Sequence, residues 1–351
     1  MRLILPSSTP PLRRLNRLLS GKAFAGARFF ILVDEQTCQH CLPRLVSEVE
    51  ALQEAEFFEV PTGEECKALE IAAQLWQSLL ESGADRQSVI VNLGGGTVSD
   101  LGGFVAAAYQ RGIRYVNIPT TLIGMADAAI GGKTALNVQG YKNQVGFFHS
   151  PDIVCIEPSF LDTLPREELV SGLFEMLKTL LLAEPAMYEQ LLDLASRPKL
   201  KVPPEMIATC AQIKSAIVKA DFKEHGIRRI LNLGHTFGHG IESFGHQPGQ
   251  RPLPHGHAVG LGMACALYLS VQKLGLSQEV LAQYRQCLFQ LVAPPRYSLR
   301  DTEEIMSYMR HDKKNADGEL RCVLLQAPGE PVIDLAVSEA EARTALLHIA
   351  D

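Results

Sequence analysis

The chain has 351 residues, of which 46% are hydrophobic and 21% charged, and its 33 basic and 39 acidic side chains give a formal net charge of −6. This composition is typical of a globular protein, and the length excludes a single small module and predicts about two domains of roughly 150 residues each. The mildly acidic balance argues against nucleic acid as a partner, because nucleic-acid binding depends on broad positive charge. An anionic ligand would have to be held by a few individually placed cations.

The apolar segments predict a cytoplasmic protein that does not enter a membrane. The first apolar run covers only residues 3–5, which is too short for the hydrophobic part of a secretory signal. The longest run, 258–271, has the length of a buried core helix rather than of a membrane span. Eight scattered cysteines fit thiols kept reduced in a cytosol, and we interpret Cys38 and Cys41 as small buried hydrophobes rather than as a redox or metal pair.

The first half of the chain alternates between two kinds of segment. Four short runs rich in β-branched and aromatic residues cover 29–33, 89–93, 115–119 and 153–157, and helix-like stretches such as 64–82 separate them. This alternation indicates parallel strands joined by helices, with the sheet buried on both faces. We therefore predict an α/β nucleotide-binding domain, a doubly wound parallel sheet, over residues 1–164.

The second half, residues 165–351, is expected to be a mainly helical domain. Leu169, Leu173, Leu177 and Leu180 recur at spacings of four, four and three, which is the pattern of one apolar stripe on a helix. Near the C-terminus, residues 320–326 and 331–337 are typical of two strands joined by the short turn at 327–330.

Two features of the first half suit a nucleotide. An apolar strand runs into Gly94, Gly95 and Gly96 and then into a helical stretch, so that backbone N–H groups could face a pyrophosphate; a tight turn without a ligand is an equally good interpretation. Asp34 follows the strand at 29–33 and could accept hydrogen bonds from ribose hydroxyls or simply cap the next helix.

A pair of histidines in the second half suits a metal ion. On a helix, His235 and His239 would lie on one face about one turn apart, as two metal ligands or as one ligand and one proton carrier. A plain surface helix is the alternative, but the flanking residues are apolar or glycine. His255 and His257 open a further apolar helix, and at most one of them can face a site shared with His235.

A third ligand is expected because catalytic zinc sites usually have three protein ligands. Glu175 is the best candidate, since it lies within the apolar stripe, where a carboxylate must be paired or coordinated. Lys178 follows one turn later on the same side, so an ordinary Glu–Lys surface pair remains the alternative. Separately, a few cations in glycine-rich or apolar contexts could form a pocket for a small, strongly anionic substrate, although each alone is typical of a solvated charge: Lys133, Lys142, Lys214, Arg228 and Lys313.

Taken in order, these segments resemble the 3-dehydroquinate synthase family, within the sugar-phosphate cyclases, from about Asp34 to Lys314. The motifs that carry the resemblance are GEECK at 63–67, GGGTVSDLGG at 94–103, YQRG at 109–112, PTTL at 119–122, DAAIGGKT at 127–134, YKN at 141–143, LPREELVSGLFEMLK at 164–178, NLGHTFGHGIE at 232–242, PHGHAV at 254–259 and HDKK at 311–314. One departure is His257, which stands where the family commonly has glutamate.

The resemblance implies a role for each matching residue. It makes Glu175, His235 and His255 ligands of a divalent metal, zinc or cobalt, and His239 a proton carrier. The residues along NAD would be Asp34, Glu64, Lys67, Gly94, Gly95, Gly96, Asp100, Thr120, Thr121, Lys142, Phe160, Leu161, Asp162 and Thr163. The residues that hold substrate would be Asp127, Lys133, Asn143, Lys178, Lys214, Arg228, Asn232 and Lys313 (or its neighbour Lys314), with Arg111 reaching a phosphate across the interface of a homodimer.

The resemblance also implies an activity. The family converts 3-deoxy-D-arabino-heptulosonate 7-phosphate into 3-dehydroquinate and phosphate in aromatic amino acid biosynthesis, by transient oxidation with NAD, elimination, reduction and aldol closure. Two alternatives stay open: a related cyclase of the valiolone or inosose type, whose substrate lacks a carboxylate, and a metal-dependent polyol dehydrogenase, which would release NADH. A non-catalytic metal-binding homologue is a third.

Overall fold

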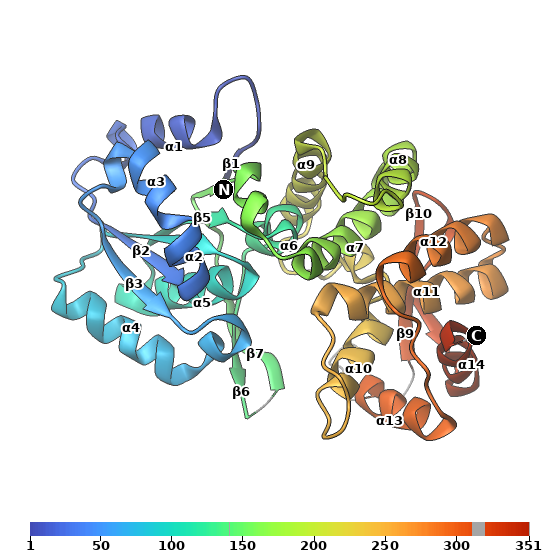
Figure 1. Ribbon diagram of the computed structural model, residues 1–351. Coiled ribbons are helices and arrows are strands. Elements are labelled where there is room, and N and C mark those ends of the chain that lie inside the picture. Colours follow the sequence, from blue (N-terminus) through green and yellow to red (C-terminus); the bar gives the residue numbers. More distant parts are fainter. Residues whose placement is uncertain (140, 311–319, 351) are drawn as a thin grey trace. The chain divides into compact units, whose positions relative to one another are not determined.

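The computed structural model describes residues 1–139, 141–310 and 320–350 (Figure 1). Its contacts form two compact units, a first one of Met1–Pro165 with Pro204–Lys223 and a second one of Arg166–Pro203 with Glu224–Asp351. The expected division at residue 164 assigned 204–223 to the second domain, whereas this segment has its contacts in the first unit. The two-domain division itself stays a prediction.

A six-stranded sheet, parallel throughout, forms the first unit, which confirms the predicted fold class. Its strands, in spatial order, are β1 (Arg2–Ile4), β8 (Ile153–Cys155), β5 (Arg114–Pro119), β4 (Val89–Gly94), β2 (Phe29–Asp34) and β3 (Glu56–Val60). The four strands predicted from β-branched and aromatic runs are all present. The sequence pattern missed β1, which has three residues, and β3, whose exposed edge position gives it no continuous apolar run.

Helices cover both faces of this sheet (Figure 1). The chain moves from β2 outward to β3 and then back to β4, so right-handed crossovers place the connecting helices on opposite faces. The α-helices of the unit are α1 (Pro11–Leu19), α2 (Glu35–His40), α3 (Leu42–Glu48), α4 (Leu69–Glu81), α5 (Gly96–Ala108), α6 (Leu122–Ala126) and α9 (Pro204–Ala220). The 3₁₀ turns are η1 (Lys22–Phe24), η2 (Glu50–Leu52), η3 (Gly63–Lys67), η4 (Tyr109–Arg111), η5 (Ala128–Ile130) and η6 (Pro158–Thr163).

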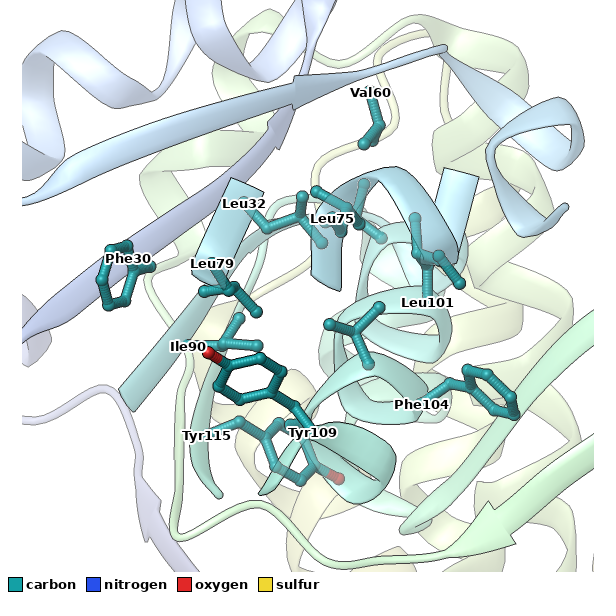
Figure 2. Packing of buried hydrophobic residues seen from close by; sticks show 14 of the residues in the cluster. Phe30, Leu32, Val60, Leu75, Leu79, Ile90, Leu101, Phe104, Tyr109 and Tyr115 are labelled. Carbon is teal, nitrogen blue, oxygen red and sulfur yellow. The ribbon is translucent and has the colours of Figure 1, made fainter. Parts of the chain in front are cut away.

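The core beneath α4 and α5 shows why the strands have continuous apolar runs (Figure 2). Phe30 and Leu32 of β2 point into this core, where they join Leu75 and Leu79 of α4. The intervening β2 residues point to the opposite face, because side chains alternate along a strand, and they are buried there as well. A strand buried on both faces is apolar at every position, as the sequence indicated.

The sequence analysis also missed a hairpin in the first unit. Strands β6 (Lys133–Val138) and β7 (Tyr141–Phe148) pair antiparallel and form a separate two-stranded sheet. Their glycine-flanked, polar sequences lack a clear two-residue period. Segment α9 belongs to this unit because it packs against α6 and η5.

The second unit is mainly helical and carries the predicted late strand pair, β9 (Leu320–Ala327) and β10 (Glu330–Val337), which is antiparallel. Its helices are α7 (Arg166–Ala183), α8 (Pro185–Ala195), α10 (His235–Gly245), α11 (His255–Leu274), α12 (Gln278–Leu291), α13 (Leu299–Arg310) and α14 (Glu339–Ala350), with the 3₁₀ turn η7 (Ile227–Asn232). The single apolar stripe predicted for α7 is wrong: every residue from Val170 to Leu182 is buried, and α8, α11 and η7 pack against this helix.

The structure also bears on the expectations about membrane spans and about Cys38 and Cys41. Within the described residues, no helix is both long and apolar enough to cross a membrane. The cysteines of the CxxC pair are free thiols, Cys41 buried and Cys38 half-buried, and burial raises the pKa of Cys41 to about 11. Such a thiol is largely protonated near neutral pH, which favours the structural interpretation over a redox one.

Candidate functional site

Three side chains of the second unit converge on one point. Glu175 comes from the middle of α7, whereas His235 and His255 are the first residues of α10 and α11. Glu175 Oε1 lies 3.5 Å from His235 Nε2 and 3.6 Å from His255 Nε2, and one ligand atom from each of the three residues lies within 4.8 Å of the others. Metal–ligand bonds of about 2.0–2.2 Å put neighbouring ligands of a tetrahedral site about 3.4 Å apart. This geometry fits a divalent cation.

Close helix contacts bring these residues together. A Cβ on Gly256 would lie 2.0 Å from the Ser171 carbonyl oxygen, so α11 approaches the α7 backbone as only glycine permits. The Gly256 amide also donates a hydrogen bond of 3.0 Å to Ser171 Oγ. On the other side of α11, a Cβ on Gly262 would lie 2.1 Å from the Gly234 carbonyl oxygen, next to the start of α10. Glycines at the helix contacts therefore set the spacing of the three ligands.

Both imidazoles present Nε2 because Nδ1 has another partner. His235 Nδ1 lies 3.2 Å from the Leu233 carbonyl oxygen, and His255 Nδ1 lies 3.0 Å from Glu242 Oε2. In the neutral imidazole each acceptor holds the proton on Nδ1, so the Nε2 lone pair is available to a metal ion. This is the tautomer that a metal-ligating histidine needs.

The electrostatics also fit a cation. Glu175 is 1% exposed and forms a buried ion pair with Lys178, so the alternative of a Glu–Lys surface pair is wrong. Burial alone would raise the pKa of Glu175, but Lys178 and His255 hold it well below its ordinary value. Burial alone would lower the pKa of His255, but hydrogen bonds and charge from Glu175 and Glu242 raise it to about 10. Neighbours that favour a proton on Nε2 would equally favour a metal ion there. One carboxylate and two imidazoles are a donor set that suits zinc or cobalt.

Two other histidines flank the cluster. The His239 ring centroid lies 5.3 Å from that of His235 and 6.0 Å from that of His255, so His239 is next to the three ligands. His257 instead packs edge-on against the Phe174 ring at 6.2 Å, and burial lowers its pKa. Only His255 of the His255–His257 pair lies with His235, as helix geometry predicted. A buried imidazole with a lowered pKa is neutral near pH 7, so the side chain at position 257 carries no charge there.

In the first unit, most residues expected along NAD lie at the carboxyl edge of the sheet. Asp34 ends β2, Gly94 ends β4 opposite Pro119 of β5, and Thr120 and Thr121 follow directly. The segment Phe160–Thr163 lies in η6, beyond the carboxyl end of β8. In open parallel sheets this edge is where ligands bind.

Side-chain contacts join η3, α5 and the β6–β7 hairpin near this edge. Lys67 Nζ lies 2.8 Å from Asp100 Oδ2 and also donates to Asn143 Oδ1, and Glu64 accepts from Asn137 at 2.8 Å. Burial alone would lower the pKa of Lys67, but the charges of Asp100 and Glu64 raise it.

The two interpretations of Asp34 are separable. Its carboxylate accepts from the Thr37 amide at 2.8 Å and its amide donates to the Thr37 hydroxyl, a capping box at the start of α2. The structural role is therefore present, while a ribose contact stays a prediction.

The predicted strand–turn–helix is found at Gly94–Gly96, where α5 begins at Gly96 without a side-chain cap. Helix N–H groups without a side-chain cap are suited to an anion.

The residues expected to hold substrate form two sets. In the first unit, Lys214 of α9 pairs with Asp127 at 2.7 Å, which brings residues 87 positions apart together. In the second unit, Asn232 donates to Glu224 at 2.7 Å, and the buried Arg228 lies 3.9 Å from the same carboxylate. Lys133 and Arg111 are exposed, and Lys142 lies on β7. Lys313 lies outside the described residues.

Sequence reasoning missed three polar partners at these sites. Glu242 faces His255, Glu224 faces Asn232 and Arg228, and Asn137 faces Glu64. A signal for Glu242 was present, because His235, His239 and Glu242 have the spacing i, i+4, i+7 and so share one helix face. Glu224 precedes Arg228 by four residues but lies before the 3₁₀ turn rather than on an α-helix, and Asn137 and Glu64 are 73 residues apart, so neither contact could be predicted from helical spacing.

Comparisons with known proteins cover both units. A family model described as 3-dehydroquinate synthase N-terminal matches residues 57–171, and one described as 3-dehydroquinate synthase C-terminal matches residues 172–315. A protein of Parabacteroides distasonis named 3-dehydroquinate synthase is 38% identical over 316 residues, which cover 89% of this chain and 88% of that protein.

Solved structures share the fold. A 2-epi-5-epi-valiolone synthase from Streptomyces hygroscopicus, with NAD⁺ and Zn²⁺ bound, matches with a TM-score of 0.82 and 27% identity, covering 99% of this chain and 96% of that chain. A 2-deoxy-scyllo-inosose synthase, complexed with carbaglucose-6-phosphate, NAD⁺ and Co²⁺, matches with a TM-score of 0.84 and 22% identity over the same shares of the two chains.

Proposed function

This chain belongs to the 3-dehydroquinate synthase family, and on that premise we propose that it is a phosphate-eliminating lyase dependent on NAD and a divalent metal. Its substrate would be 3-deoxy-D-arabino-heptulosonate 7-phosphate, a small sugar phosphate that also carries a carboxylate, and its products 3-dehydroquinate and phosphate. The observation that carries the metal dependence is the convergence of Glu175 Oε1 with the Nε2 atoms of His235 and His255.

The cofactors would supply what amino-acid side chains cannot. When bound, the cation would polarise a substrate hydroxyl, and NAD would accept a hydride and later return it to the same substrate. In the second unit, Glu175, His235 and His255 would hold the metal. In the first unit, the residues at the carboxyl edge of the sheet would hold NAD, with helix α5 directing its N–H groups at the pyrophosphate.

His239 is proposed as the proton carrier. Its ring lies beside His235 and His255, and its place one turn after His235 on α10 lets it reach a hydroxyl near the metal ligands. The imidazole would take the hydroxyl proton as the hydride leaves, a role that histidine fills more often than any other side chain.

The cations would bind the two acidic ends of the substrate. We propose that Arg228 and Asn232 hold the carboxylate, since Glu224 already orients both side chains. The remaining residues proposed to hold substrate are Asp127, Lys133, Asn143, Lys178, Lys214 and Lys313, with Arg111 contacting the phosphate. These residues would promote the successive reaction steps mainly by holding the substrate in one orientation.

A phosphate-release assay tests this function. The full-length protein is incubated with the heptulosonate phosphate, with and without a chelator and with catalytic amounts of NAD. We expect phosphate release that stops with chelator, recovers with Zn²⁺ or Co²⁺, and proceeds without accumulation of NADH. Absence of release with metal and NAD supplied would overturn the proposal.

Two parallel reactions separate the alternatives. Turnover of a sugar phosphate that lacks the carboxylate, but not of the heptulosonate phosphate, would identify a cyclase of the valiolone or inosose type. Steady accumulation of NADH with glycerol-like polyols would identify a dehydrogenase.

A further inference from the structure

We infer that Glu242 is a positioning residue for the metal centre: by accepting the Nδ1 proton of His255, it holds that imidazole with Nε2 directed at the site. The inference rests on the proposed function, because it concerns how one of the proposed ligands is oriented. Glu242 itself is not among the three converging ligand residues.

The contact joins two helices. Glu242 Oε2, on α10, lies 3.0 Å from Nδ1 of His255, the first residue of α11. The Glu242 side chain is 8% exposed, so its carboxylate is largely withdrawn from water. A carboxylate taken out of water is costly unless it is paired, and His255 provides a partner. His255 is thus one of the groups that stabilise the buried carboxylate, and the same contact orients the imidazole.

The two histidines differ in how they are held. His235 is 13% exposed, and its Nδ1 faces the Leu233 carbonyl oxygen of its own chain segment. His255 is 36% exposed, so packing restricts its ring less than that of His235. The Leu233 carbonyl oxygen is positioned by the backbone next to His235, whereas the orientation of the His255 ring depends on a side chain from another helix. The orientation of His255 is therefore the one that a single substitution can remove.

The charge of Glu242 has a further effect. A carboxylate that accepts the Nδ1 proton increases the electron density at Nε2 and makes it a better ligand, and loss of such partners typically weakens metal binding 10- to 100-fold. Glutamine at 242 would keep an acceptor oxygen but lose the charge. Alanine would lose both.

Metal affinity of the full-length protein is the direct test. Wild type, Glu242→Gln and Glu242→Ala are stripped of metal and titrated with Zn²⁺ in competition with a chromophoric chelator. We expect Zn²⁺ to bind roughly 10- to 100-fold more weakly to Glu242→Ala and less than about 10-fold more weakly to Glu242→Gln. The visible absorption bands of bound Co²⁺ should change in Glu242→Ala, since they report ligand geometry. Glu167→Gln, an exposed glutamate on α7, is the matched control and should bind as wild type does.

Thermal midpoints and a double variant separate loss of folding from loss of the contact between Glu242 and His255. The thermal midpoint of metal-free Glu242→Gln should stay close to that of metal-free wild type, which excludes loss of folding as the cause. His255→Ala should lower Zn²⁺ affinity strongly, and adding Glu242→Ala to it should lower affinity no further, because Glu242 acts through His255. Wild-type Zn²⁺ affinity in folded Glu242→Ala would overturn the inference. Wild-type affinity in His255→Ala would instead overturn the metal site of the proposed function.

Discussion

The carboxyl edge of the sheet in the first unit, the proposed NAD site, and the Glu175–His235–His255 triad of the second unit, the proposed metal site, are built from different parts of the chain. The edge consists of turns that follow parallel strands, at Asp34, Gly94–Gly96 and Thr120–Thr121. The triad consists of side chains on α7, α10 and α11, brought into contact by glycines. A site formed by backbone at strand ends follows from sheet topology, whereas a site formed by side chains requires three helices packed in one register. Substitutions should therefore have larger effects at the triad.

The largest effect is expected for Glu175→Gln. Metal-dependent phosphate release should be lost, and the free energy of unfolding should fall by about 3–5 kcal/mol, because buried Lys178 loses its carboxylate partner. NAD binding, measured by fluorescence titration, should persist because its proposed residues lie in the other unit. Urea unfolding gives the stability, with Glu167→Gln as the exposed control on the same helix. Near-normal turnover after removal of the metal would contradict the assignment.

The next largest effect is expected for His239→Asn. The rate of phosphate release should fall roughly 10²- to 10⁴-fold, the usual contribution of one acid–base group, while Zn²⁺ stays bound. Metal content and steady-state kinetics measure the two effects separately. Loss of Zn²⁺ from this variant would show that His239 is a ligand and that the proton carrier lies elsewhere.

A smaller effect should appear at the proposed NAD site, where the capping role of Asp34 can be separated from its predicted ribose contact. Asp34→Asn should keep the free energy of unfolding within about 0.5 kcal/mol, because asparagine caps helices as well as aspartate does. Its NAD affinity should fall about tenfold, since a charged acceptor binds a hydroxyl more strongly than a neutral one. Asp34→Ala should in addition lose about 1 kcal/mol of stability. Unchanged NAD affinity in both variants would leave Asp34 with its capping role alone.

The smallest effect concerns an ion pair of the second unit that is partly exposed, in contrast to Glu175–Lys178. Lys273, followed by the amide and hydroxyl of Ser338, lowers the pKa of Glu341 to about 2. A depressed pKa stabilises the fold above the unfolded value of about 4.3, and this contribution is lost as the pH falls toward 2. Glu341→Gln should cost no more than about 1 kcal/mol at pH 7, because the pair is screened by water. Urea unfolding at several pH values should show the difference shrinking below pH 4; a constant difference would point to lost hydrogen bonds instead.

Much of the fold was predictable from local pattern. Four central strands and the late strand pair carry enough apolar, β-branched residues to be recognised, whereas edge strands β1 and β3 and the hairpin β6–β7 do not. The i, i+4 spacing correctly placed His235 and His239 together on a helix. Glu175 was singled out by its apolar surroundings, but spacing could not place it beside His235, because the two residues are 60 positions apart in sequence. The resemblance to a family, rather than spacing, singled out His255 over His257.

The order of the apolar runs, the histidine spacing and the family motifs were available in the amino-acid sequence, since each depends on residues close together in the chain. Tertiary structure alone decided that α9 groups with the first unit, that α7 is buried on all sides, and that Glu242 faces His255. These features depend on which surfaces meet when helices pack. A chain pattern with a period of 3.6 residues specifies the face of a helix but not the neighbour against which that face is buried.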